Sequence, residues 1–211
     1  MKPWLNEILA CPMDKHYPLK LFVFEYETSL EEFKRYLDIY NKRDIDSIHE
    51  ENLVIMSKDD EGNLLYKDNI IIKPIPLRDY INRIILSIDE MDHVVDKSKL
   101  EISKKCFKIV KNDVKNKIQE FSGHLSIERF EEILPELLLL NRIKMEVEIN
   151  SGLILCEECN RWFPIEDTIP KMLPDEYRNE QEDRIFLSKA FENYYLEGDI
   201  TKEDLKLFNN H

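Results

Sequence analysis

The spacing of apolar and polar residues changes along the chain. Residues 19–26 are rich in β-branched and aromatic side chains and predict a strand, which follows a short apolar turn or helix at 4–10. From residue 29 the apolar positions recur at helical spacing, and from residue 144 they alternate with charged residues. The two ends of the chain therefore indicate β-structure, whereas the middle indicates helices.

Four helices are predicted in the middle of the chain. The first begins at a capping box formed by Ser29 and Glu32. The apolar spacing places the others at 77–88, 100–121 and 126–140. Pro135 is expected to kink or split the last helix, because proline lacks the amide hydrogen that a helix interior needs. A turn and two short strands are also predicted, at 60–63, 52–56 and 70–73.

The C-terminal part returns to strand spacing. Residues 145–149 predict one strand, and Asn150-Ser151-Gly152 predicts a turn into a second strand that leads to Cys156. After Pro174 a charged helix is expected, with Gly198 as its end. Its apolar side consists of Ile185, Leu187, Ala190, Phe191 and Tyr194.

Composition narrows the functional classes. The chain has 43 acidic and 30 basic residues and a net charge of −13, which argues against direct binding of a phosphate backbone. No stretch approaches the roughly 20 apolar residues of a membrane span, and no signal-peptide core follows the first residues, so a cytoplasmic protein is expected. With four glycines, the chain contains neither of the common phosphate-binding glycine motifs. Nucleotide-dependent enzymes of the common kinds are therefore disfavoured.

Cysteines near both ends of the chain suggest a metal site. Cys156-Glu157-Glu158-Cys159 on a turn would direct two thiolates at one tetrahedral metal, with the remaining ligands from a second loop. Cys11-Pro12-Met13-Asp14 is the candidate second loop, with Asp14 or His16 as the fourth ligand. Two interpretations stay open: the loops bind zinc, or they are bare turns held by apolar neighbours. A redox role is disfavoured, because residues 160–164 do not resemble the helix start that activates a thiol.

The residues around these cysteines resemble a known family. The first block is Leu5-Asn6-Glu7-Ile8-Leu9-Ala10-Cys11-Pro12-Met13-Asp14-Lys15. The second runs from Gly152 through the C-x-x-C motif to Trp162-Phe163-Pro164-Ile165 and continues into 169–174. Together they resemble the Trm "one-twelve" family, the small activator subunit shared by class I methyltransferases. The second block is the more specific, because it combines three motifs at the family's spacing.

The resemblance implies an α+β fold and a non-catalytic role. Residues 1–27 and 144–174 would form a zinc-ribbon-like domain, 28–143 a mostly helical insert, and 175–211 a helical extension. The implied partners are S-adenosylmethionine-dependent methyltransferases that modify tRNA, ribosomal RNA or translation release factors. The partner, and not this chain, would bind S-adenosylmethionine and contact the RNA. Cys11, Cys156 and Cys159 match ligands of zinc-binding members, whereas Asp14 stands where some relatives have cysteine.

A short apolar segment is the candidate contact with the methyltransferase. Interface cores are enriched in aromatic residues and methionine, and an exposed strand edge can pair with a partner strand. The predicted partner-binding residues are Phe163, Ile169, Met172 and Leu173. The alternative for Phe163 is the domain's own core. The alternative function is a zinc-ribbon module that binds RNA or a translation or transcription complex directly.

Overall fold

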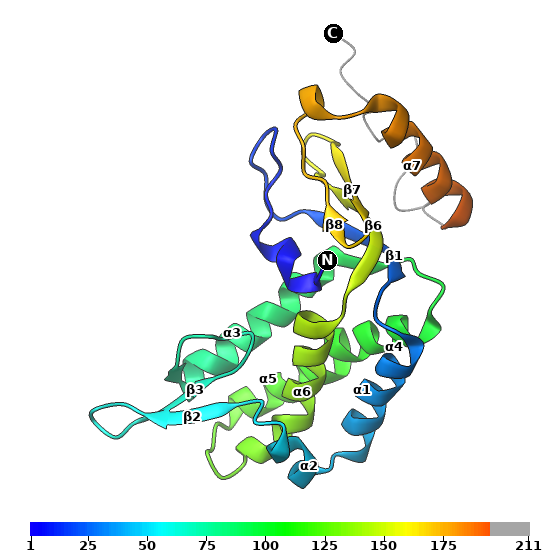
Figure 1. The fold of residues 1–211 in the computed structure, drawn as a ribbon. Helices are drawn as coiled ribbons and strands as arrows, with labels where there is room; N and C mark the ends of the chain where they lie inside the picture. Colours follow the sequence, from blue (N-terminus) through cyan, green and yellow to red (C-terminus); the bar gives the residue numbers. More distant parts are fainter. Residues whose placement is uncertain (195–211) are drawn as a thin grey trace. The chain divides into compact units, whose positions relative to one another are not determined.

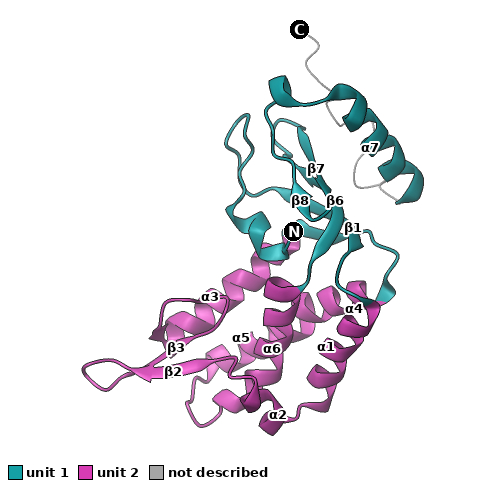
Figure 2. Cartoon of the chain, in the orientation of Figure 1, with its two compact units in different colours: residues 1–29, 93–101, 147–211 teal, residues 30–92, 102–146 magenta. Residues whose placement is uncertain are grey.

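A computed structural model describes residues 1–194 of the chain. The chain divides into two compact units (Figure 2). Unit 1 comprises residues 1–29, 93–101 and those described from 147 onward, and unit 2 comprises 30–92 and 102–146. No helix in the described part is long and apolar enough to cross a membrane.

Unit 1 is built on a five-stranded sheet (Figure 1), with strand order β5-β1-β6-β7-β8. The strands are β1 (Lys20–Tyr26), β5 (Val94–Asp96), β6 (Ile149–Leu155), β7 (Trp162–Glu166) and β8 (Ile169–Pro170). β5 pairs parallel to β1, and the other neighbours are antiparallel. Lys20 pairs with Leu155, so the beginning of β1 and the end of β6 meet at one end of the sheet. The 3-10 helix η1 (Pro3–Ile8) precedes β1.

Helix α7 (Glu180–Asn193) packs on one face of this sheet. Its N-cap is Asn179, whose side-chain oxygen accepts from the amides of Gln181 and Glu182. The shared core consists of Phe22, Phe24, Leu153, Leu155 and Trp162 from the sheet with Leu187 and Ala190 from the helix. Trp162 stacks on Phe186 with ring centroids 5.9 Å apart. The predicted charged helix is thus confirmed, although Ile185 is 49% exposed and Gly198 lies outside the described residues.

The strand predicted at 19–26 is confirmed, but the turn predicted at 150–152 is wrong. Residues Ile149–Leu155 form one continuous strand. Gly152 is a point of close approach instead, because a Cβ there would lie 2.6 Å from the carbonyl oxygen of Phe22. The hairpin is formed by β6 and β7, and the loop that carries Cys156 and Cys159 connects them.

Unit 2 is mostly helical. Its helices are α1 (Leu30–Lys42), α2 (Ile45–Glu50), α3 (Leu77–Asp89), α4 (Glu101–Ile109), α5 (Lys115–Gly123) and α6 (Leu134–Asn141). A π-helical turn, Val110–Val114, joins α4 to α5, and another, Arg142–Glu146, follows α6. All eight residues of α6 are buried, which makes it the central helix of the unit. A small sheet of β2 (Ile55–Lys58), β3 (Leu64–Lys67) and β4 (Ile75–Pro76) completes it.

The first three predicted helices are confirmed, but two other predictions in unit 2 are wrong. Residues 126–129 are not helical. The expected split near Pro135 is confirmed: the run divides into the 3-10 helix η4 (Phe130–Ile133) and α6, and Pro135 lies in the first turn of α6, where its missing amide costs nothing. Residues 70–73 are a loop, because the carboxylate of Asp68 accepts from the amides of Ile70 and Ile71. The adjacent residues 64–67 form β3 instead, and the first predicted strand lies slightly later, at 55–58.

The assignment of 28–143 to a single insert stays a prediction. That assignment does not include β5 in the β domain. Residues 93–101 belong to unit 1, because Val94, Val95 and Asp96 pair with β1. The α+β class is confirmed, as is the joining of the N- and C-terminal segments around a helical insert.

Candidate metal centre

Four side chains from the two ends of the chain converge at one end of the sheet of unit 1. They belong to Cys11, Asp14, Cys156 and Cys159, and one ligand atom from each lies within 4.8 Å of the others. The Sγ atoms of Cys11 and Cys159 are 3.7 Å apart, and the Asp14 carboxylate oxygens lie 3.5 and 3.7 Å from Sγ of Cys156. The strand pairing of β1 with β6 brings these loops together.

The two loops share one backbone arrangement. The amide of Cys11 donates to the carbonyl of His16 (3.0 Å), and the amide of Cys156 donates to the carbonyl of Arg161 (2.8 Å). Each bond spans five residues, and each loop has a left-handed residue directly after its second ligand, Lys15 (φ 64°) and Asn160 (φ 57°). Asp14 therefore occupies the place in the first loop that Cys159 occupies in the second.

The protonation states of these groups follow from their surroundings. Cys11 and Cys156 are buried, Cys159 is half-buried and Asp14 is exposed. Burial raises the pKa of the Cys11 and Cys159 thiols, so both are protonated at neutral pH. The amide of His16, which donates to Asp14 Oδ1 (2.9 Å), lowers the pKa of that carboxyl to about 2. A metal ion would displace the thiol protons and meet an already charged carboxylate.

Two of the separations within this group fit zinc. At zinc–sulfur and zinc–oxygen distances of about 2.3 and 2.1 Å, tetrahedral geometry separates two thiolates by about 3.8 Å and a thiolate from an oxygen by about 3.6 Å. The separations of 3.7 Å between Cys11 and Cys159 and 3.5 Å between Asp14 and Cys156 match these values. The Sγ atoms of Cys11 and Cys159 are also too far apart for a disulfide, and none of the four cysteines forms one.

The group of four contains Asp14 and not His16. His16 contacts the first loop through its backbone: its amide donates to Asp14, and its carbonyl accepts from the amide of Cys11. Cys106 is fully buried in α4 of unit 2, as its helical spacing predicts, and does not belong to the group.

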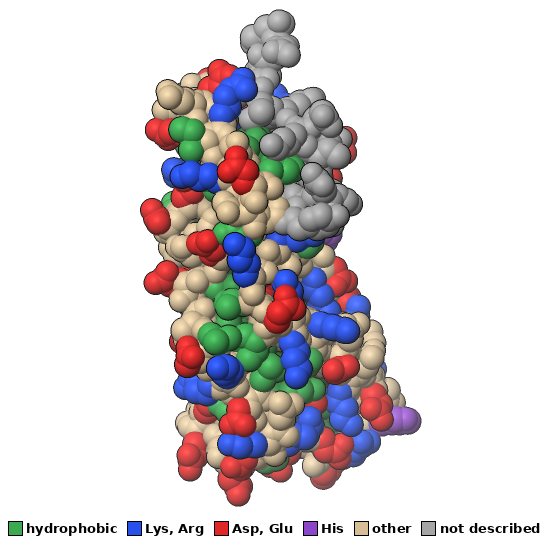
Figure 3. Space-filling view, turned by 90° about the vertical axis from the view of Figure 1, so that its right-hand side faces the viewer, with side chains coloured by type: hydrophobic (Ala, Val, Ile, Leu, Met, Phe, Trp, Pro, Cys, Tyr) green, Lys and Arg blue, Asp and Glu red, His purple; other side chains and the backbone are tan. Residues whose placement is uncertain are grey.

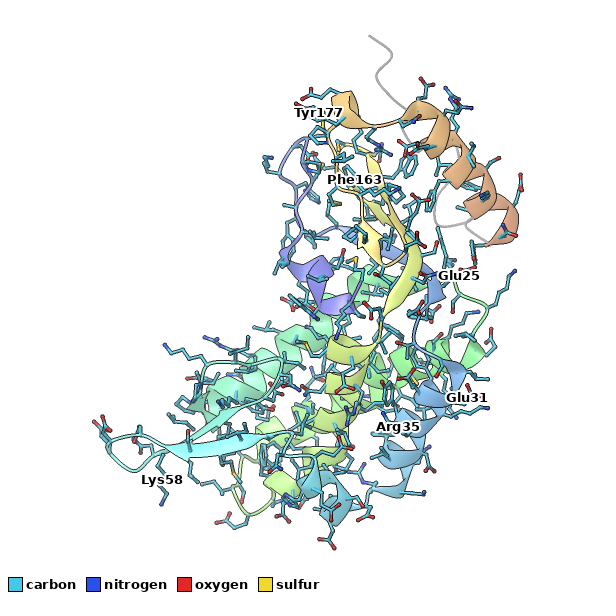
Figure 4. All side chains as sticks on the ribbon, in the orientation of Figure 1. Glu25, Glu31, Arg35, Lys58, Phe163 and Tyr177 are labelled. Atoms are coloured by element: carbon cyan, nitrogen blue, oxygen red, sulfur yellow. The ribbon has the colours of Figure 1, made fainter. Side chains whose placement is uncertain are left out.

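The four predicted partner residues lie in different environments. Phe163 is fully buried in β7, in the core of unit 1 (Figure 4). Ile169, on the edge strand β8, is 62% exposed, Leu173 is 44% exposed, and Met172 is half-buried. Ile169 and Leu173 therefore present apolar surface, and Phe163 supports the sheet beneath it.

Further exposed apolar residues lie on the segments around the metal group, and sequence analysis missed them. Met13, inside the first loop, is 41% exposed, Ile8 is 68% exposed and Tyr177 is 69% exposed. The segment of Tyr177 is fixed beside the second loop by an ion pair of 2.8 Å between Arg161 and Asp175. For Met13 and Tyr177, an apolar side chain among polar neighbours was the signal that could have identified them, whereas Ile8 lies in an apolar run and gave no such signal.

Comparison with known proteins identifies one family. The family model described as Trm112p-like protein matches residues 2–167, which is most of the chain and includes all four side chains of the metal group. No curated protein matches the sequence.

Proposed function

Since the chain belongs to the Trm112p-like family, whose members are known as non-catalytic activators of methyltransferases, we propose that it is an activating and stabilising subunit of class I methyltransferases. The clients modify tRNA, ribosomal RNA or a translation release factor in the cytoplasm. The client binds S-adenosylmethionine, and this chain contributes a surface that covers apolar residues of the client.

The observation that supports this proposal is a set of exposed apolar residues in unit 1, on the first metal loop and on the segments that precede Cys11 and follow Cys159 in the chain. Here "the docking surface" means Ile8, Met13, Ile169, Leu173 and Tyr177, all more than 40% exposed. Large apolar side chains on one set of neighbouring segments are typical of a protein interface. Within the described residues, β8 pairs only with β7, so Ile169 lies at the edge of the sheet.

Zinc has a structural role in this proposal. Held by Cys11, Asp14, Cys156 and Cys159, it would link the two loops, and one of them carries Met13 of the docking surface. Such sites contribute directly to folding free energy.

The charge of the chain supports RNA binding through the client. Figure 3 shows acidic and basic side chains interspersed over one side of the molecule, without a continuous basic surface in that view. With a net charge of −13, the chain is a poor ligand for a phosphate backbone. The client therefore supplies most of the RNA-binding surface.

A pull-down from native cells tests the proposal. The tagged full chain is compared with a double variant, Ile169→Glu with Leu173→Glu, and with Ile185→Glu as the matched control on α7, where the exposure is 49%. Mass spectrometry should recover class I methyltransferases with the wild type and with Ile185→Glu, and lose them with the double variant. Recovery of ribosomes or RNA without any methyltransferase would refute the proposal and favour direct RNA binding.

A further inference from the structure

The hairpin of β2 and β3 in unit 2 has an open edge. In the described part of the chain β2 pairs only with β3, and all four of its residues are exposed (Figure 1). Ile55 and Met56 are 48% and 53% exposed, which is unusual for an edge strand, because edges are normally protected by charged residues or proline. Lys58 is the only charged residue of the strand and lies at its C-terminal end (Figure 4).

An apolar pocket lies beside this edge. Its volume is about 410 Å³, and its apolar lining includes Val54, Met56, Ile127, Phe130 and Leu134. Ile127 is itself 53% exposed at the pocket.

The pocket lies against one face of the hairpin, where β2 begins. Tyr66 of β3, which pairs with Met56, contacts Phe130 of the pocket wall with ring centroids 4.9 Å apart. No residue of β3 or β4 lines the pocket, whereas the residues preceding β2 and those of the 3-10 helix η4 (Phe130–Ile133) do. Val54 and Met56 are two residues apart, so they share one face of the strand, and that face borders the pocket. A strand added to the open edge would therefore place alternate side chains over the pocket. Main-chain pairing combined with pockets for alternate side chains is the arrangement by which sheets bind extended peptides.

The segments that border the pocket are acidic. Residues 44–51 contain four acidic residues and no lysine or arginine, and residues 126–132 contain three acidic residues and one arginine. Glu131 lines the pocket with its side chain 65% exposed, and it pairs with His49 at 3.2 Å. This charge favours a basic ligand. It disfavours a second copy of the chain, because each copy has a net charge of −13.

We propose that the open edge of β2 and the adjoining pocket bind an extended, basic segment of a partner protein by strand addition. The segment has apolar residues at alternating positions, which enter the pocket, and its lysine or arginine residues give it a positive charge that complements the acidic segments around the site. This site is in unit 2 and is distinct from the docking surface of unit 1, so it does not depend on the proposed methyltransferase role.

The probe is the fluorescein-labelled peptide KVKVTIK, titrated into the full chain and followed by fluorescence anisotropy. Hydrogen exchange should show slower exchange at residues 54–58 when the peptide is bound. A peptide with N-methyl groups on one edge keeps the charge but cannot pair, and should bind at least about tenfold more weakly. The acidic analogue EVEVTIE should also lose at least about tenfold, because its charges are reversed against the same border.

A pair of matched variants locates the site. Met56→Lys should weaken KVKVTIK binding at least about tenfold, because it places a charge in the pocket. Ile72→Lys makes the same charge change at a residue of unit 2 that is 79% exposed and does not line the pocket, and it should leave binding within about twofold. Circular dichroism and thermal unfolding verify that both variants fold.

Three results would overturn the proposal. The first is no binding of KVKVTIK. The second is equal affinity of the chain for KVKVTIK and its N-methylated form or EVEVTIE, or equal affinity of Met56→Lys and the wild type for KVKVTIK. The third is a wild-type homodimer in sedimentation that Met56→Lys dissociates, since the edge would then be occupied by a second copy.

Discussion

Replacing Gly152 with alanine tests whether the close approach of β6 to β1 holds the metal loops together. The added Cβ would lie 2.6 Å from the backbone carbonyl oxygen of Phe22 and 3.3 Å from Cδ1 of Ile165. Ordinary contacts of a Cβ begin at 3.4 Å, so the two central strands must separate by several tenths of an ångström. The Ile165 side chain can rotate away, whereas the Phe22 carbonyl is held by the sheet.

These contacts set the expected loss of unfolding free energy in Gly152→Ala. Overpacking a well-packed core costs about 1–3 kcal/mol, and a clash with backbone favours the upper end of that range. Alanine also restricts the unfolded chain, which offsets about 0.4–1 kcal/mol. We expect Gly152→Ala to lower the free energy of unfolding of unit 1 by about 2 kcal/mol.

Urea unfolding followed by tryptophan fluorescence measures this change, because the two tryptophans, Trp4 and Trp162, both belong to unit 1. The matched control is Gly123→Ala at the end of α5, where a Cβ meets nothing within 4 Å. It should leave the fluorescence transition unchanged and stabilise the helical transition, seen by circular dichroism, by up to about 0.5–1 kcal/mol. Equal stability of Gly152→Ala and the wild type would refute the close approach of the two strands.

Three further predictions concern the cysteines and the metal. Asp14→Ala should lower zinc affinity by more than about 100-fold in competition with a chromophoric chelator, whereas Asp14→Cys should retain it; equal affinity of Asp14→Ala and the wild type would show that Asp14 is not a ligand. Removing zinc with a chelator should lower the urea midpoint seen by tryptophan fluorescence and leave the helical transition in place, and a shift of both would contradict a site confined to unit 1. Cys106→Ala should cost about 1–2 kcal/mol of stability, because the thiol is buried in α4, without changing the zinc content measured by atomic absorption.

The elements that sequence analysis predicted are those whose pattern is local. α1 and α3 have clear helical periods over 13 residues, β1 is a run of seven residues rich in β-branched and aromatic side chains, and all three are present. β5 has only three residues, and its partner strand β1 lies about 70 residues earlier, so no local pattern identifies it. The run Ile70–Ile72 is more apolar than β3, but the Asp68 carboxylate binds its amides, and Ile72 is 79% exposed.

The sequence predicted three of the four side chains of the metal group but could not identify the fourth. The spacing of Cys156 and Cys159, with Cys11 near the other end of the chain, identified three candidate ligands, and these three converge with Asp14. Spacing could not choose between Asp14 and His16, because both follow Cys11 closely. The choice depends on the backbone of the loop, which gives Asp14 the position equivalent to Cys159 and uses the amide of His16 to orient the carboxylate.

The two loops have equivalent backbones, and their shape does not require the metal. In each loop a backbone hydrogen bond across five residues and a left-handed residue shape the turn, and neither depends on the identity of the ligands. The pairing of Lys20 with Leu155 holds the loops side by side through main-chain bonds of the sheet. Exchanging a thiolate and a carboxylate at position 14 is therefore expected to leave the fold intact. Because Met13 lies directly before Asp14 and is exposed, an ion bound there would fix one residue of the docking surface, which would couple metal binding to client binding as well as to the stability of unit 1.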